Sequence, residues 1–587
     1  MKSAAPDSYA ATSEHISEQA LSLWREYASL PHYVSTVVDP LGMSTPIFRA
    51  LGAWVLHPME LTRQLAEMNA MVWRLQQHVV RRACGFASED PLPARPDDAR
   101  FKDPVWTDAV LWDAVKETYL AVTRGLQDML YNTPGLDVRE RRKAAFWWRM
   151  WLNMIAPTNF LPTNPVAQRK ALQSGGASLL AGARVFLDDL RAGDVQMNDN
   201  SAFKLGKNVA TTPGAVIARF PLVEIIHYTP TQKTTFATPI VIVTPWINKF
   251  YILDLSEKKS MVRYLLDQGY EVFITSWKNP DEELRDTSFE DYVVEGVHAA
   301  IDTACRFAGV RKVHAVGYCI GGTALTTYLA WANRQFAADE VPVADWTLFT
   351  TLADFSAPGD IEVFVDEATV NHLSREMVKN GYLDGKNMAM SFRMLRSNSL
   401  IWHYVVHGWL YGETPPAFDV LFWNTDSTRM PAAMHEWYLR ELYLANRLIE
   451  ADALTIGGQP IDLGRIAQPL YSVAAQDDHI APWQQVFRTL RHISADKRFV
   501  LSSSGHILGI VNPPVKPPKR HYRVGTAHRA DRSSHWRERA ELHEGSWWED
   551  WMAWLKPRAG ELVAARPASD ERHPALCAAP GTYVREA

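Results

Sequence analysis

Short apolar runs alternate with helical segments along the middle of the chain, and this alternation restricts the fold more than any other feature. From residue 239 onward, runs of strand length rich in Val, Ile, Phe and Tyr are followed by segments of helical character. The expected strands are 239–244, 270–277, 312–319 and 345–352, and two of the expected helices are 291–308 and 320–334. Parallel strands need crossovers of this kind, so the pattern predicts a mostly parallel sheet with helices on both faces.

The alternation is interrupted once and then resumes. It stops after Asp354 and continues with expected strands at 469–475 and 497–503. The segment between them is rich in Trp, Tyr and Phe. An insertion between two strands of one sheet is a common way to build a lid, so residues 355–450 are expected to form one.

The parts of the chain that flank this core have other patterns. A length of 587 residues favours two to four modules. Residues 1–45 are polar and weakly patterned and are interpreted as a flexible leader. Apolar residues at helical spacing predict an N-terminal helical region at 46–204. The catalytic domain is expected at 205–560, and residues 561–587 are interpreted as a C-terminal tail.

Composition excludes several classes of protein. The 61 Lys and Arg against 66 Asp and Glu give a net charge of −5, which argues against a nucleic-acid partner. No run of about 18 apolar residues occurs, so no membrane span is expected. The four cysteines are far apart and form neither a disulfide framework nor a zinc motif. A reducing, cytoplasmic location is therefore expected.

The residues around Cys319 form the sharpest motif in the sequence. The string Gly317-Tyr318-Cys319-Ile320-Gly321 follows an expected strand and opens an expected helix. It matches the G-x-nucleophile-x-G elbow of hydrolases, with Cys where those enzymes usually place Ser. The start of the helix favours a thiolate at Cys319, and the N–H of Ile320 is then an expected oxyanion donor.

An acid and a histidine follow the two strands after the insertion. Asp477 and Asp478 come after the first strand, and His506 comes after the second. The order nucleophile, acid, histidine is that of α/β-hydrolases. The residues themselves barely separate Asp477 from Asp478. A second oxyanion donor is expected in the loop after strand 239–244, most plausibly the backbone N–H of Ile247.

Several motifs together resemble the polyhydroxyalkanoate synthases, including poly(3-hydroxybutyrate) synthases, and the length is similar to that of the class I type. The motifs are PWINKFYILDL (245–255), SWKNPD (276–281), GYCIGGT (317–323), FDVLFWNTDSTRMP (418–431), DDHIAPW (477–483) and SGHILGIVNPP (504–514). The resemblance implies an α/β-hydrolase fold with an inserted lid and an N-terminal helical region. It also selects Asp478 as the acid, because the family pattern places Asp directly before His-Ile.

The resemblance implies an acyltransferase that polymerises (R)-3-hydroxyacyl-CoA into a polyester and releases CoA. CoA is then part of the substrate, and no separate cofactor or metal is expected. Within the shared motifs, Trp423, Asn248 and Asp254 are candidates for contacts with the substrate or the lid. The family further implies a homodimer that associates with polyester granules in the cytoplasm.

The expected site makes chemical sense of this reaction. A cysteine thiolate exchanges with a CoA thioester at little energetic cost, and the acyl-Cys319 stays activated toward a hydroxyl group. His506 is expected to take the thiol proton. Asp478 is expected either to orient His506 or to help deprotonate the attacking 3-hydroxyl, and the sequence does not choose between these roles.

Two other functions fit parts of the sequence. The same three residues are compatible with a cysteine hydrolase that cleaves esters, lactones or thioesters. A non-enzymatic scaffold on a granule surface would use the N-terminal helices. A complete nucleophile, acid and base in order argue against a scaffold, which needs none of them.

Overall fold

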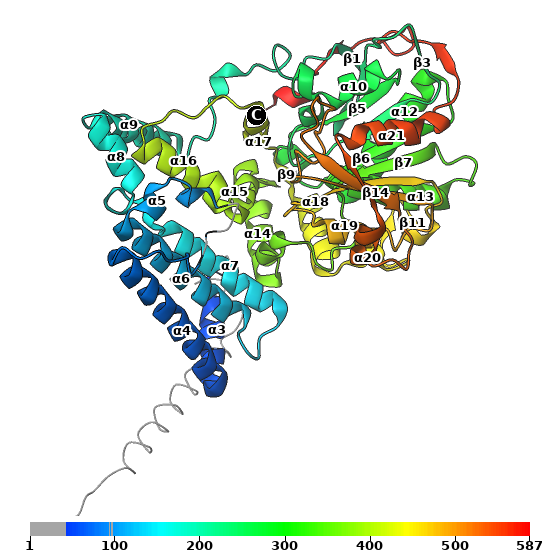
Figure 1. The fold of residues 1–587 in the computed structure, drawn as a ribbon. Helices are drawn as coiled ribbons and strands as arrows, with labels where there is room; N and C mark the ends of the chain where they lie inside the picture. Colours follow the sequence, from blue (N-terminus) through cyan, green and yellow to red (C-terminus); the bar gives the residue numbers. More distant parts are fainter. Residues whose placement is uncertain (1–42, 93, 95–97, 587) are drawn as a thin grey trace, which may run out of the picture. The chain divides into compact units, whose positions relative to one another are not determined.

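The computed structural model describes residues 43–92, 94 and 98–586 and divides into two units (Figure 1). Among these residues, the helical unit comprises 43–195, 366–372 and 396–414, and the sheet unit comprises the remainder. The leader expected at 1–45 lies, up to residue 42, outside the described residues. The sheet unit begins at Gln196, a few residues before the boundary expected from the sequence.

The helical unit consists of helices packed against one another. Its main helices are α3 (Thr45–Leu56), α4 (Pro58–Ala83), α5 (Val105–Asp108), α6 (Val110–Tyr131), α7 (Val138–Met154), α8 (Pro165–Gln173) and α9 (Ala177–Ala192). Figure 1 shows α4 packed along α6, and α6 along α7. Leu75 and Ala121 are buried between α4 and α6, whereas Leu65 and Val72, also on α4, are exposed.

Part of the insertion packs in the helical unit instead of remaining with the sheet. Residues 396–414 contain three short helices, η10 (Asn398–Trp402), α16 (His403–Val405) and η11 (Val406–Leu410). The indole N–H of Trp409 donates to Asp189 on α9 at 2.7 Å. Gly182 on α9 lies directly against the carbonyl of Trp409, where no larger residue fits. These contacts divide the expected lid at 355–450 between the two units.

The sheet unit contains eleven strands in one sheet. Their order is β15-β14-β13-β12-β7-β6-β4-β5-β2-β1-β17. The central strands β5, β4, β6, β7, β12 and β13 are parallel, and the strands on either side are antiparallel. The bounds are β1 (Gly214–Arg219), β2 (Val223–Tyr228), β4 (Ile240–Val243), β5 (Val272–Trp277), β6 (Val313–Tyr318), β7 (Val343–Phe349), β12 (Leu470–Ala475), β13 (Lys497–Ser502), β14 (His521–Thr526), β15 (Glu541–Glu544) and β17 (Cys577–Ala578). The expected parallel core is therefore confirmed.

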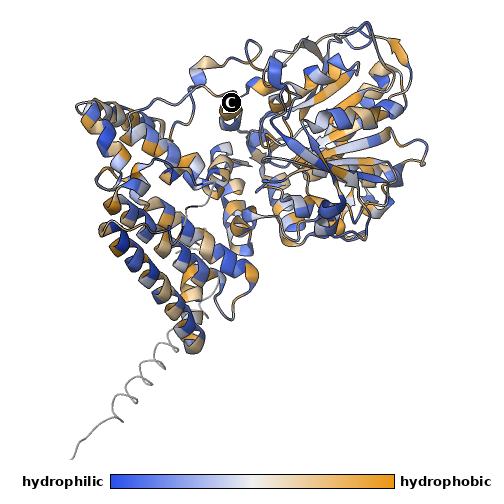
Figure 2. Ribbon diagram, in the orientation of Figure 1, coloured by the Kyte–Doolittle hydropathy of each residue, from blue (hydrophilic) through white to orange (hydrophobic). Residues whose placement is uncertain are grey.

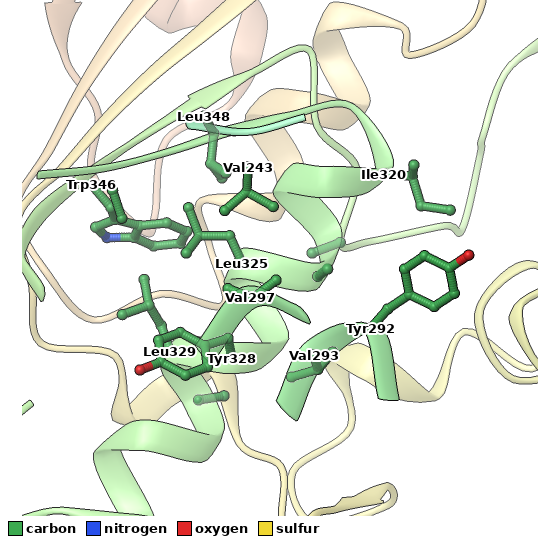
Figure 3. Close-up of a cluster of buried hydrophobic side chains, with 14 of the residues drawn as sticks. Val243, Tyr292, Val293, Val297, Ile320, Leu325, Tyr328, Leu329, Trp346 and Leu348 are labelled. Atoms are coloured by element: carbon green, nitrogen blue, oxygen red, sulfur yellow. The ribbon is translucent and has the colours of Figure 1, made fainter. Parts of the chain in front are cut away.

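Helices cover both faces of this sheet and enclose two apolar cores. The first core lies under α12 (His298–Ala308), α13 (Ile320–Gln335) and α19 (Trp483–Thr489), and the second lies under α10 (Met261–Asp267) and α21 (Trp547–Leu555). Alternate residues of one strand point to opposite cores, as Val243 and Ile242 of β4 do. Figure 2 shows that the central strands are largely hydrophobic. Figure 3 shows Val243, Leu325 and Trp346 meeting in the first core.

The C-terminal segment is an integral part of the sheet unit, which corrects the expected tail at 561–587. Strand β16 (Leu562–Ala564) pairs with β3 (Thr234–Phe236), and β17 extends the edge of the main sheet. The ammonium of Lys249 is buried and donates to the carbonyls of Val584 and Glu586 at 2.9 and 2.6 Å. Strands of two or three residues leave no periodic signal, so the sequence pattern misses them.

Among the described residues, no helix combines the length and the apolar character needed to cross a bilayer.

Candidate active site

Cys319 lies in a strained turn between β6 and α13. Its backbone has φ +53° and ψ −125°, an unfavourable combination for a residue with a Cβ. The Cys319 N–H donates to the carbonyl of Phe349 on β7 at 2.9 Å, and its own carbonyl accepts the N–H groups of Gly322 and Thr323. These bonds hold the residue in the strained conformation and place its thiol at the start of α13.

The glycines around Cys319 are required by close packing. A Cβ at Gly317 would lie 2.5 Å from the Cα of Gly322, and a Cβ at Gly321 would lie 2.5 Å from the carbonyl oxygen of Thr244. A Cβ at Gly322 would overlap the hydroxyl of Thr351. The turn can therefore form only with glycine on both sides of the cysteine.

Asp478 and His506 meet at the ends of adjacent parallel strands. Asp478 follows β12 and His506 follows β13, and the two loops are joined where the N–H of Asp477 donates to the carbonyl of Ser504 at 2.9 Å. Nδ1 of His506 lies 2.7 Å from Oδ2 of Asp478. Asp478 and His506 are buried, whereas Asp477 is exposed. The geometry therefore places Asp478, and not Asp477, against the histidine.

The other carboxylate oxygen of Asp478 is held by its own loop. Oδ1 accepts the N–H groups of Ile480 and Ala481 at 2.8 and 2.9 Å. These two bonds fix the carboxylate in the plane in which Oδ2 meets the imidazole of His506. Asp478 is thus oriented before any substrate binds.

The imidazole of His506 lies between an acid and a thiol. Burial disfavours its charged form, but the negative charges of Asp478 and of a Cys319 thiolate, and hydrogen bonds with both, outweigh burial and raise the pKa of His506 to about 10. The ring stacks on Tyr318, with the two centroids 5.7 Å apart, and the Tyr318 hydroxyl donates to the His506 carbonyl at 3.3 Å. The structure therefore brings Cys319, Asp478 and His506 together, with His506 in contact with both partners.

The two expected oxyanion donors both have free N–H groups within the described residues. Neither the N–H of Ile320, at the first position of α13, nor that of Ile247, in the loop after β4, has an acceptor among them. Gly321, next to Ile320, packs against the carbonyls of Val243 and Thr244, which immediately precede the Ile247 loop. Both candidates therefore belong to backbone segments that meet beside the cysteine turn.

The three further candidates have different environments. The indole N–H of Trp423, on α17 (Asp419–Thr425), donates to the carbonyl of Lys249 at 2.6 Å, and Asn248 forms an antiparallel bridge with Ser427. Both residues therefore connect the Ile247 loop to the insertion. The carboxylate of Asp254 is buried, accepts the hydroxyls of Thr212 and Ser260, and is structural rather than part of the site.

The sequence did not single out two tyrosines that lie near the thiol. Tyr438 and Tyr443 belong to the π-helix η12 (Tyr438–Leu444) and are hydrogen-bonded to each other. Burial raises the pKa of both phenols, and the charge of a Cys319 thiolate raises it further. Both lie in the aromatic insertion, but composition alone cannot show which aromatic residues of an insertion reach the site.

One group among the described residues has the spacing of metal ligands, and it lies in the helical unit. His78, Asp90 and Asp113 each offer an atom within 4.8 Å of the others. The ammonium of Lys116 lies 3.2 Å from Asp90 and 3.1 Å from Asp113, and His78 lies 2.8 Å from Asp113. The Lys116 ammonium lies among these carboxylates, so the group is part of an ion-pair network.

Comparisons with known proteins identify two matching families. Residues 97–265 match the poly-beta-hydroxybutyrate polymerase N-terminus, and residues 239–513 match the alpha/beta hydrolase fold. The latter match confirms the fold expected from the nucleophile, acid and histidine order.

Three curated relatives resemble the chain over most of its length. It is 40% identical to the poly(3-hydroxyalkanoate) polymerase of Methylorubrum extorquens over 92% of this chain and 90% of the relative. It is 36% identical to the poly(3-hydroxyalkanoate) polymerase subunit PhaC of Rhizobium meliloti over 99% and 95%, respectively. It is 39% identical to the polymerase subunit of the same name in Cupriavidus necator over 83% of each chain.

Proposed function

Because the chain belongs to the poly(3-hydroxyalkanoate) polymerase family, we propose that it is an acyltransferase that joins (R)-3-hydroxyacyl units from CoA thioesters into a polyester. The observation that carries this proposal is the sulfur nucleophile at position 319, beside an imidazole that a buried carboxylate orients. Free CoA and a chain longer by one unit are the products of each cycle.

The proposed reaction has two transfers. The Cys319 thiolate attacks the thioester carbonyl, the bond to the CoA sulfur breaks, and an acyl-Cys319 thioester forms. The 3-hydroxyl of another unit then attacks the acyl carbonyl, an ester forms, and the Cys319 sulfur leaves. Exchange of one thioester for another costs little, whereas a thioester transfers its acyl group to an alcohol with a favourable free energy. Sulfur therefore suits this sequence better than a serine oxygen.

His506 is the proposed proton carrier in both transfers. In the first transfer His506 holds the proton taken from the Cys319 thiol and passes it to the leaving CoA sulfur. In the second transfer the neutral imidazole takes the hydroxyl proton and keeps it as the Cys319 thiolate leaves. The sequence leaves two roles open for Asp478, and the geometry supports the orienting role. One of its oxygens contacts His506 and the other accepts two backbone N–H groups, so no oxygen of Asp478 is left without a partner.

The N–H groups of Ile320 and Ile247 are the proposed donors to the oxygen of each tetrahedral intermediate. Two donors fixed in a site that excludes water stabilise that negative charge far more than water would. The buried Trp423 and Tyr438 and the partly buried Tyr443 of the insertion support the exclusion of water. Without such exclusion, the acyl-Cys319 would be hydrolysed to a free acid.

Assembly and location remain expectations from the family. We propose a homodimer that works at the surface of the polyester it makes, inside the cytoplasm. By resemblance, the preferred monomer is expected to be short, with three to five carbons.

A direct assay tests the proposed function. Purified protein incubated with (R)-3-hydroxybutyryl-CoA is expected to release CoA thiol and to make the solution turbid as insoluble polyester forms. Release of CoA with only soluble 3-hydroxybutyrate as product would instead identify a hydrolase. No release of CoA from this or longer 3-hydroxyacyl thioesters would contradict the proposal, whichever nucleophile is present.

A further inference from the structure

The loop that carries Ile247 is attached to the insertion by several contacts. Asn248 pairs with Ser427 as an antiparallel bridge, and the carbonyl of Lys249 accepts the indole N–H of Trp423. The ammonium of Lys249 lies 2.9 Å from the carboxylate of Asp426. These contacts decide where the loop lies, because they hold its C-terminal half against residues 423–427.

A different residue of the insertion decides how the peptide groups of Ile247 are turned. Thr428 is buried, its hydroxyl donates to the carbonyl of Trp246, and its N–H donates to the carbonyl of Ile247 at 3.2 Å. These two carbonyls belong to the peptide groups on either side of the Ile247 Cα. Thr428 therefore fixes the orientation of both peptide groups.

The geometry of a peptide group links the Thr428 hydroxyl to the expected oxyanion donor. In a trans peptide the C=O and the N–H are coplanar and point in opposite directions. The carbonyl of Trp246 and the N–H of Ile247 belong to the same peptide group. When the Thr428 hydroxyl holds the carbonyl, it also sets the direction of the N–H, which has no acceptor among the described residues.

We propose that Thr428 is a positioning residue for the oxyanion donor of Ile247. This inference rests on the proposed function and deepens it, because it assigns to the insertion a part in the catalytic geometry besides the exclusion of water. Without the hydroxyl, the loop stays attached through Trp423 and Asp426 while the 246–247 peptide group is free to rotate. The negatively charged intermediate then loses much of one hydrogen bond, whereas substrate binding in the ground state changes little.

Thr425, three residues earlier, provides a matched control. Its hydroxyl donates to the carbonyl of Phe422 within its own helix α17 at 2.9 Å and, among the described residues, forms no hydrogen bond with the Ile247 loop. Thr425→Val and Thr428→Val remove the same group from the same part of the insertion. Only the second removes a bond to the loop.

The experiment compares steady-state CoA release by the wild type, Thr428→Val, Thr428→Ser and Thr425→Val. Removing a whole oxyanion donor lowers kcat by about 10²–10³-fold, so misdirecting one by Thr428→Val is expected to lower kcat by about 10–100-fold. KM and the thermal midpoint should stay close to those of the wild type. Thr428→Ser keeps the hydroxyl and is expected to retain most of the wild-type kcat.

The outcomes separate positioning from a merely structural role. A normal kcat for Thr428→Val, or an equal loss in Thr425→Val, would overturn the inference. So would a loss that follows the folded fraction, or a loss that Thr428→Ser does not restore. If Thr428→Val does not fold, Thr428→Ala repeats the comparison without the buried methyl group. If the wild type itself releases no CoA, the proposed function fails, and this inference fails with it.

Discussion

Replacing Cys319 by alanine is expected to abolish CoA release from (R)-3-hydroxybutyryl-CoA. Loss of a nucleophile costs on the order of 10⁶ in kcat where it acts as a unit with its base, which is below the detection limit of a thiol assay. The thiol lies at the start of α13 in contact with His506, and no other described cysteine contacts this histidine. The measurement is the initial rate of thiol release at saturating substrate.

The serine variant tests the chemical reason for sulfur. Cys319→Ser keeps a nucleophile in the same turn, but its acyl ester is about as stable as the product ester and has lost the drive for transfer. We expect at most a small residue of polymerising activity. A turnover close to that of the wild type would contradict the thioester argument, even if the alanine variant were inactive.

Cys305 provides the matched control for both variants. It lies on α12, half-buried, and burial raises the pKa of its thiol to about 11. Cys305→Ala is expected to leave the rate of CoA release unchanged within about twofold, because surroundings of this kind keep a thiol unreactive. A loss like that of Cys319→Ala would mean that alanine at any internal cysteine inactivates the protein.

The second large effect is expected from Asp478→Asn. The carboxylate orients His506 and is the strongest influence that keeps its proton, so the amide leaves the imidazole poorly oriented and less basic. Losses of about 10³–10⁴-fold in kcat follow an Asp-to-Asn change in comparable triads. The exposed neighbour Asp477 is the control, and Asp477→Asn is expected to retain most of the activity. A large loss of activity in Asp477→Asn, with nearly normal activity in Asp478→Asn, would show that Asp478 is not the acid.

The ion pair between His506 and Asp478 also makes the folding stability of the protein depend on pH. Because the pKa of His506 is raised to about 10 in the folded state, its proton stabilises the fold fully below the unfolded value near 6.5. This contribution is lost as pH rises through the pKa that His506 has in the folded protein. Asp478→Asn is therefore expected to show a smaller decrease in the free energy of unfolding between pH 6.5 and about 10 than the wild type, measured by urea denaturation.

The sequence could predict the part of the site that depends on the order of strands, helices and motifs along the chain. Strands, helices and glycines place Cys319 at a turn, and the ends of the next two strands supply an acid and a histidine. The choice between Asp477 and Asp478 needed the direction of each side chain, which the two N–H bonds to Oδ1 of Asp478 determine. The resemblance made the same choice from the neighbouring His-Ile.

The features that the sequence could not predict depend on contacts between distant segments. Asp254 lies in a shared motif, yet its bonds to Thr212 and Ser260 place it in a structural role. Tyr438 and Tyr443 lie near enough to Cys319 to feel its charge, and they belong to a π-helix, whose hydrogen bonding leaves no distinct spacing in the sequence. The positions of the C-terminal strands and of residues 396–414 also depend on distant partners such as Lys249 and Asp189.

The central claim is that the growing chain is attached to the sulfur of Cys319, and one measurement tests it directly. The protein is mixed briefly with (R)-3-hydroxybutyryl-CoA, quenched in acid and digested, and the peptides are analysed by mass spectrometry. We expect the peptide that contains Cys319 to carry one or more 3-hydroxybutyryl units that neutral hydroxylamine removes. Acyl groups on another residue, or polyester formed while the Cys319 peptide stays unmodified at every time point, would contradict the account.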